Sequence, residues 1–302
     1  MSLIIKMPNK IDDNRIGSSF NHLFNIMSIM DSSEEEDVEW DFSETELLNP
    51  FFLLPLVVYK NKCGKNIKCT HLSSYVRSYL DAIHFLDFID AEKEKQFPEY
   101  IKKYAEKRYI PMIKFPASKC KDTVKNNILS AIGNILKIQL NIKGEIYSAL
   151  DYMLTELIDN ITEHSDSEYG YIFAQYYPKE KYVDICIIDN GITILGSYAK
   201  IGRKDIKNDV EAMKSASIGV STKNLPEAEN RGYGIVTSKK MLTEGLGGNF
   251  FVFSGGAFYR KDKENDIVVG LPKNIKWDGT VVLLRIPYSE NKEFKYTNFL
   301  EV

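Results

Sequence analysis

The stretch TELIDNITEHS, residues 155–165, decides how the fold is interpreted. Its apolar residues recur at helical spacing, as in an amphipathic helix that packs one face on a sheet. Glu156, Asn160 and Glu163 lie at i, i+4 and i+7 and therefore form a separate polar stripe. Taken alone, such a stripe is most often the solvated face of a surface helix. It also suits a hydrated Mg²⁺ site, in which the Asn carbonyl ligates the ion and the Glu orients or deprotonates an attacking group.

The composition is that of a folded globular protein rather than a disordered chain. With 302 residues, 44% hydrophobic and 27% charged, the chain has room for one large domain or two ordinary ones. Its formal net charge of −3 gives no general reason to expect binding to nucleic acid or to a membrane. The longest apolar run, FFLLPLVVY at 51–59, is too short to span a bilayer, and no signal peptide is evident. We therefore expect a cytoplasmic protein.

The four cysteines show no CxxC pair and no regular metal-ligand spacing. Cys63, Cys69 and His71 could chelate a metal ion, but their spacing is loose and the signal is weak. Free thiols in a reducing cytoplasm are the simpler interpretation.

Residues 1–100 predict a small α/β domain in which helices and strands alternate. Apolar residues at helical spacing predict a helix over 16–30, and VEWDF at 38–42 alternates like a strand. NIKCTH at 66–71 predicts a second strand. Each of these strands leads to a helix with a recognisable start.

Those two helix starts carry typical capping residues. Asn49 and Pro50 open a short apolar helix, because Pro is favoured at the first helical position. Ser73 and Ser74 provide the cap of the helix that follows the second strand.

The boundary between the two predicted domains lies near residue 100. The charged segment 87–108 predicts a connecting helix, punctuated by Pro98, Pro111 and Pro116. Residues 101–302 then predict an α+β sandwich, a mixed sheet with one face covered by helices. The helices are expected at 122–140, around Glu156 and at 234–244. The strands are expected at 169–177, 182–189, 249–255, 256–262 and 279–287.

Residues 192–231 form a long polar stretch with weak periodicity, rich in Lys, Ser, Gly and Asn. A connection of about forty residues without regular structure is unusual inside a compact domain. This one begins just after a strand that ends in Asp and finishes at a glycine-rich helix start. The placement favours a lid over a ligand site.

Asp189 ends the predicted strand YVDICIID and is followed by Asn190 and Gly191. Asp-Asn-Gly after a strand is a turn signal, so a tight surface turn is one interpretation. The other is a carboxylate directed into a pocket, where it could accept a hydrogen bond from an exocyclic amine such as that of adenine. Gly191 would then let the base approach closely.

The stretch NRGYGIVTSKKM, residues 230–241, places Gly232 and Gly234 before an amphipathic run. Glycines at a helix N-terminus leave backbone N–H groups free to face phosphate oxygens, and the helix dipole adds to the attraction. Arg231 and Lys223 would supply positive charge for a polyphosphate. Ordinary helix-entry glycines explain this motif equally well when it is taken alone.

Taken in chain order, these motifs resemble the GHKL ATPase superfamily, which includes gyrase, heat-shock ATPase chaperones and histidine kinases. The order is an E-x-x-x-N helix, a strand ending in D-x-G, a long polar stretch, a G-x-G helix start and a late strand beginning Gly279-Thr280. The chain looks closest in style to the bacterial anti-sigma-factor serine kinases, whose glycine motif also follows an Arg. The resemblance covers about residues 110–287.

This resemblance implies a two-layer α/β sandwich that binds ATP and Mg²⁺. It gives Glu156 the role of general base and Asn160 that of Mg²⁺ ligand, and it places Glu163 near the adenine pocket. Asp189 would be the carboxylate that recognises adenine, with Gly191 behind the base.

The remaining family positions complete the implied nucleotide site. Gly232 and Gly234 would contact the phosphates, with Tyr233 between them where Leu or Met is common. Thr280 would support the adenine-binding carboxylate. The usual D-x-G-x-G pattern is D-N-G-I-T here, so Thr193 replaces the second glycine, at the hinge of the lid.

Residues 1–100 resemble in pattern a STAS domain, the fold of anti-sigma-factor antagonists. Many of those antagonists carry a phosphorylatable Ser just before a helix, where this chain has Asn49, Pro50 and Phe51. Because none of the three carries a hydroxyl, the resemblance implies a docking module rather than a phosphorylation switch.

Two functions from different classes follow. In the first, the protein binds ATP with Mg²⁺ and either hydrolyses it or transfers a phosphoryl group to a protein, with Glu156 activating the attacking water or hydroxyl. A histidine kinase is disfavoured, because His22, His71 and His84 lie outside any long dimerisation hairpin and no membrane segment is evident. In the second, the protein is a non-catalytic regulator that senses ATP or ADP and docks a protein partner through its first domain. The sequence leaves open whether it forms a homodimer.

Overall fold

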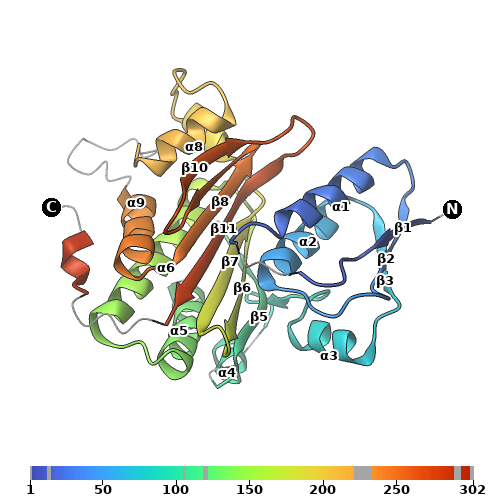
Figure 1. Ribbon diagram of the computed structural model, residues 1–302, viewed down its shortest axis with the longest axis horizontal. Helices are drawn as coiled ribbons and strands as arrows, with labels where there is room; N and C mark the ends of the chain where they lie inside the picture. Colours follow the sequence, from blue (N-terminus) through green and yellow to red (C-terminus); the bar gives the residue numbers. More distant parts are fainter. Residues whose placement is uncertain are drawn as a thin grey trace.

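The computed structural model is a mixed α/β structure whose described residues form one sheet of three strands and one of eight (Figure 1). It describes residues 2–11, 15–94, 96–104, 106–117, 122–220, 233–288 and 294–299. The coarse prediction of a mixed α/β protein is confirmed.

The small sheet is parallel and has the order β1-β2-β3, with strands β1 Leu3–Lys6, β2 Asp37–Asp41 and β3 Asn66–Thr70. Its helices are α1 Phe20–Ser32, α2 Pro50–Lys62 and α3 Ser74–Ala82. We call residues 3–82 the N-terminal unit. Both predicted caps are confirmed. The Asn49 side chain accepts a hydrogen bond from the Phe52 N–H at 3.0 Å, and Ser73 accepts one from the Val76 N–H at 3.2 Å.

The large sheet has the order β10-β9-β8-β11-β7-β6-β5-β4. Its pairs are antiparallel except for β4 and β5, which run parallel. The strands are β4 Ile89–Asp90, β5 Tyr109–Pro116, β6 Tyr169–Tyr177, β7 Tyr182–Asp189, β8 Asn249–Gly255, β9 Ala257–Lys261, β10 Asp266–Gly270 and β11 Trp277–Pro287.

Helices cover one face of this sheet and enclose a core rich in Ile and Leu (Figure 1). The long helices are α5 Asp122–Gln139 and α6 Gly144–His164, and α9 Tyr233–Lys240 lies beside α6. A π-helical turn, Met241–Gly245, continues α9, and a 3₁₀ turn, Tyr296–Phe299, contacts α6.

The N-terminal unit packs against the opposite face of the large sheet (Figure 1). Helix α2 contacts β6 and β7, and each of its residues from Pro50 to Tyr59 is buried. A helix that is apolar on all sides fits only between two packed surfaces, and α2 lies between the small sheet and the large one. The two parts of the chain therefore share one continuous apolar core.

The connecting helix predicted over 87–108 is wrong. The described part of this segment contains the two-residue strand β4 and the short helix α4, Phe97–Lys102. Pro98 lies in the first turn of α4, the only part of a helix that tolerates Pro without distortion. Strand β4 pairs with β5, and α4 packs into the core of the large sheet. The predicted boundary near residue 100 assigns this segment to the N-terminal part of the chain, whereas its contacts are with the large sheet.

Strand β5 shows why prolines misled the sequence interpretation. Pro111 and Pro116 look like chain breaks, yet both lie inside this buried strand. The pairing of β5 with β6 shifts register between Ile110 and Ile113, so Pro111 lies at a bulge, where no ladder hydrogen bond from its nitrogen is needed. Pro116 is the last residue of the strand.

The polar stretch 192–231 is not irregular throughout, so this expectation is wrong for its first half. It contains α7, Ile194–Lys200, and α8, Asp209–Ser217. Tyr198, Ile206 and Ala212 form a small core of their own between these helices. Such short, polar helices leave too little periodicity to be detected in the sequence.

Candidate functional site

Asp189 and Thr280 lie together at one end of the large sheet. Asp189 is the last residue of β7, and Thr280 lies near the start of the neighbouring strand β11. Thr280 favours the ionised Asp189 carboxyl, because its backbone N–H and hydroxyl lie close enough to lower the pKa of that group. The Gly191 N–H donates a hydrogen bond to Asp189 Oδ1 at 3.0 Å. The carboxylate is therefore held in a fixed position.

Burial dominates the charge state of Asp189. The residue is 3% exposed, and burial raises the pKa of its carboxyl to about 7. The hydrogen bond from Gly191 and the polar groups of Thr280 lower the pKa but do not offset the burial. A ligand group that donates a hydrogen bond here would favour the ionised carboxylate.

This raised pKa predicts how stability depends on pH. The folded state keeps a proton on Asp189 between pH 4 and 7 that the unfolded state has released, so protonation stabilises the fold in that window. The free energy of unfolding should fall as pH rises towards 7, by about 1.4 kcal/mol per pH unit at most from this group. Urea unfolding at several pH values measures it. The Asp189→Asn protein should lack this component, and identical pH profiles for the two proteins would contradict the assignment.

Gly279 and Trp277 also form this end of the sheet, although sequence reasoning did not select them as site residues. Gly279 has a φ of +92°, and a Cβ there would lie 2.4 Å from the Asp189 carbonyl oxygen. The Trp277 indole N–H donates to that same oxygen at 3.2 Å. The sequence signal for this turn is Asp278-Gly279, a dipeptide typical of turns.

The segment after Asp189 is tied to the end of α6. The Ile192 N–H donates to the Ser165 carbonyl oxygen at 2.6 Å. A Cβ on Gly191 would lie 1.8 Å from that oxygen, so only glycine fits there. Asn190 is held as well, because the Ser167 hydroxyl donates to its Oδ1 at 2.6 Å. The polar end of α6 is thereby fixed beside the end of β7.

Thr193 has a structural role at the start of α7. Its hydroxyl oxygen accepts a hydrogen bond from the Gly196 N–H at 3.0 Å and so caps the helix. The Ile194 N–H donates to the Ser254 hydroxyl at 3.0 Å, and Ser254 in turn donates to the Gly279 carbonyl oxygen at 2.7 Å. Helix α7 therefore begins directly from the site end of β8 and β11.

The polar stripe of α6 lies along the edge of its buried face. Glu156 and Asn160 are half-buried, and Glu163 is exposed in the last turn. The Asn160 Nδ2 is buried, and the described residues give it no hydrogen-bond partner. Because buried amides in folded proteins are nearly always paired, this one indicates a place for a ligand or water. The neighbouring Asp159 is neutralised by Lys125 of α5 at 2.8 Å.

A metal ion at this stripe would have few protein ligands. Within the described ranges, no three His, Cys, Asp or Glu side chains come together as a metal-binding group. Asn160 offers a carbonyl oxygen and Glu156 a carboxylate, which is the sparse oxygen set that hydrated Mg²⁺ accepts.

Only part of the predicted glycine motif can be placed. Helix α9 begins at Tyr233 and has Gly234 as its second residue. Lys223, Arg231 and Gly232 lie outside the described residues. Helix α9 contacts both α6 and α8.

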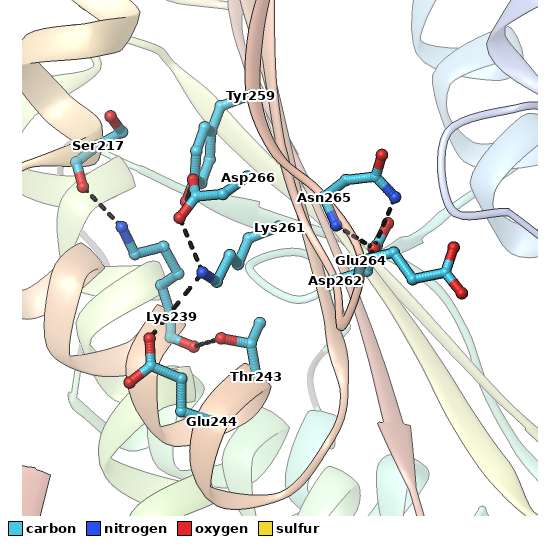
Figure 2. Close-up of polar contacts among 10 residues, drawn as sticks. All are labelled: Ser217, Lys239, Thr243, Glu244, Tyr259, Lys261, Asp262, Glu264, Asn265 and Asp266. Carbon is cyan, nitrogen blue, oxygen red and sulfur yellow. Dashed lines mark hydrogen bonds and ion pairs between the residues drawn. The ribbon is translucent and has the colours of Figure 1, made fainter.

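A polar cluster fixes the far end of α9 (Figure 2). The buried Lys239 Nζ donates to the Ser217 carbonyl oxygen at 2.7 Å, at the C-terminus of α8, and lies 5.1 Å from the centre of the Tyr259 ring. Burial lowers the Lys239 pKa. Lys261 contacts Asp266 at 2.7 Å, and the Tyr259 hydroxyl donates to the same carboxylate at 2.8 Å. The cluster thus joins α8, α9 and the β9–β10 hairpin.

No helix in the described part of the chain is both long and apolar enough to cross a membrane. Comparisons of the chain with protein-family models, with curated proteins and with solved structures found no match.

Proposed function

We propose that this protein binds ATP with Mg²⁺ and cleaves or transfers its terminal phosphoryl group, as members of the GHKL ATPase superfamily do. The observation that carries the proposal is the buried Asp189 carboxylate, oriented by Thr280 and Gly191 at the end of β7. The sequence resemblance assigns adenine recognition to this pair. Its contact supports that assignment, because a fixed buried acceptor discriminates strongly for a ligand that donates to it.

The other groups have complementary roles in the proposal. Asn160 would ligate Mg²⁺ through its amide oxygen. Its buried Nδ2, a donor without a partner among the described residues, suits an acceptor such as a phosphate oxygen. Glu156, one helical turn earlier, would accept the proton of the attacking water or protein hydroxyl. The bound Mg²⁺ would neutralise charge on the phosphate oxygens while the attacking oxygen displaces ADP.

A non-catalytic docking role for the N-terminal unit receives less support. The helix start at Asn49, which the sequence matches to the switch region of STAS antagonists, is buried. Helix α2 behind it is covered by the large sheet. A protein partner would have to use another surface of this unit.

Isothermal titration of ATP in the presence of Mg²⁺ tests the proposal, with Asp189→Asn as the critical variant. We expect this substitution to weaken ATP binding between about tenfold and a hundredfold, because a hydrogen bond to a charged group contributes about 1.5–3 kcal/mol. The protein should stay folded, since an amide avoids burying a charge.

The matched control for this measurement is Asp278→Asn. Asp278 lies at the same end of the sheet, but its carboxylate is 67% exposed and paired with Lys62. ATP affinity should change by less than about twofold in this variant, because exposed ion pairs contribute little. Equal affinities for wild type and Asp189→Asn, or no ATP binding by wild type, would refute the proposed function.

A further inference from the structure

Trp277 contacts the Asp189 backbone on the side where pairing with β11 has ended, while β6 pairs with Asp189 through Gly170 on the other side. The ladder between β7 and β11 begins at the pair Ile188–Val281, so the Asp189 carbonyl lies beyond its end. Strand β11 shifts register between Trp277 and Thr280, at the turn that contains Gly279. The bulge changes the direction of the Trp277 side chain. Its indole N–H donates to the Asp189 carbonyl oxygen at 3.2 Å.

The same indole is embedded in the core that the N-terminal unit shares with the large sheet. Trp277 is 5% exposed, and its ring lies 6.4 Å from that of Phe253 of β8. The Phe253 ring lies 5.2 Å from Phe24 and 5.8 Å from Phe20, both on α1. A chain of packed aromatic rings therefore runs from the N-terminal unit to the backbone of Asp189.

We propose that Trp277 is a positioning residue for Asp189, and that through it the N-terminal unit regulates the affinity of the nucleotide site. This inference rests on the proposed function for its ligand. Closely packed interiors transmit small displacements, and a site must be held within about half an ångström to bind well. A partner that alters the packing of α1 would change nucleotide affinity, and nucleotide would change that partner's affinity by the same factor.

The chain offers a matched pair of variants, because it contains only two tryptophans, Trp40 and Trp277. Trp40 is fully buried in the same core, and its indole N–H has no hydrogen-bond partner among the described residues. Trp277→Phe and Trp40→Phe thus remove the same group, and only the first removes a hydrogen bond to Asp189. We expect ATP affinity to fall about threefold to tenfold in Trp277→Phe, the range for one net hydrogen bond, and less than about twofold in Trp40→Phe.

A second readout needs no nucleotide. The Trp40→Phe protein leaves Trp277 as the sole tryptophan, so its fluorescence reports on the surroundings of Asp189. The emission should titrate with a midpoint near pH 7, and this transition should disappear when Asp189→Asn is added. An emission that is flat across pH 5 to 9, or a transition that survives in the double variant, would show that Trp277 does not sense the Asp189 carboxyl and would overturn its positioning role. The fluorescence measurement needs no ATP. Its outcome therefore tests the role of Trp277 even if the wild-type protein binds no ATP and the proposed function fails.

Phe24→Leu tests the regulatory step separately. Phe24 lies on α1, and the rings of Phe253 and Trp277 connect it to Asp189. If the coupling exists, this variant should lower ATP affinity by about twofold or more and move the fluorescence transition of the Trp40→Phe background. An unchanged affinity together with an unchanged transition would overturn regulation by the N-terminal unit.

Discussion

Glu156→Gln should lower ATP turnover by at least about a hundredfold, because general-base catalysis contributes about that much or more. The amide preserves the shape and hydrogen-bonding size of the side chain but cannot accept the proton of the attacking water or hydroxyl. ATP affinity should stay within about threefold of wild type, since Glu156 acts on the attacking group and not on adenine. Phosphate release, and phosphoryl transfer to candidate protein partners, measure turnover, while calorimetry measures binding.

Asp151→Asn is the matched control for that experiment. Asp151 lies on the same helix, outside the polar stripe, and its side chain is exposed. This acid-to-amide change should leave turnover within about twofold of wild type. If Glu156→Gln turned over ATP as fast as Asp151→Asn, the general-base role would be refuted while nucleotide binding could still stand.

Arg285→Met should lower the free energy of unfolding by about 3–5 kcal/mol, because it leaves a buried carboxylate without its counterion. Arg285 and Asp184 face each other across β11 and β7, with Nε–Oδ1 and Nη2–Oδ2 both at 2.7 Å. Their side chains are 10% and 1% exposed, and the guanidinium lies 4.1 Å from the centre of the Tyr182 ring. Urea-induced unfolding followed by circular dichroism measures the change.

Two further variants show whether the lost charge pairing is the cause. The double variant Asp184→Leu with Arg285→Met removes both charges and should recover most of the lost stability. Lys261→Met breaks another cross-strand pair, with Asp266, whose carboxylate is 54% exposed. That change should lower stability by less than about 1 kcal/mol. A double variant as unstable as Arg285→Met alone would show that the packing of the arginine, and not its charge, is the stabilising feature.

The sequence predicted correctly the features that depend on contacts between residues close together in the chain, such as helix caps. The caps Asn49 and Ser73 are confirmed because capping is a contact between residues three positions apart. The sequence also selected Asp189 and Thr280 as partners, and the two lie on the neighbouring strands β7 and β11 at the same end of the sheet. Their role in binding adenine stays a prediction.

The remaining features depend on contacts that no local pattern encodes. Strand β5 can contain Pro111 because its pairing with β6 has a bulge at that position. Trp277 resembles any buried aromatic residue until the bulge in β11 turns its indole towards Asp189. The packing of the N-terminal unit on the large sheet was also missed, although the run of apolar residues in α2 was visible. A helix that carries apolar residues on every side is expected to be buried on every side, and this pattern was visible in the sequence.

The burial of α2 on all sides has a consequence for the synthesis of this protein. The helix is translated early, but β6, β7 and β11, which form the surface behind it, emerge much later, and β11 comes last. Until then the apolar side chains of α2 that face the large sheet stay uncovered in the nascent chain. Nascent chains that expose such surfaces are prone to aggregate and are bound by chaperones. The first eighty residues therefore cannot complete their folding until nearly the whole chain has been made.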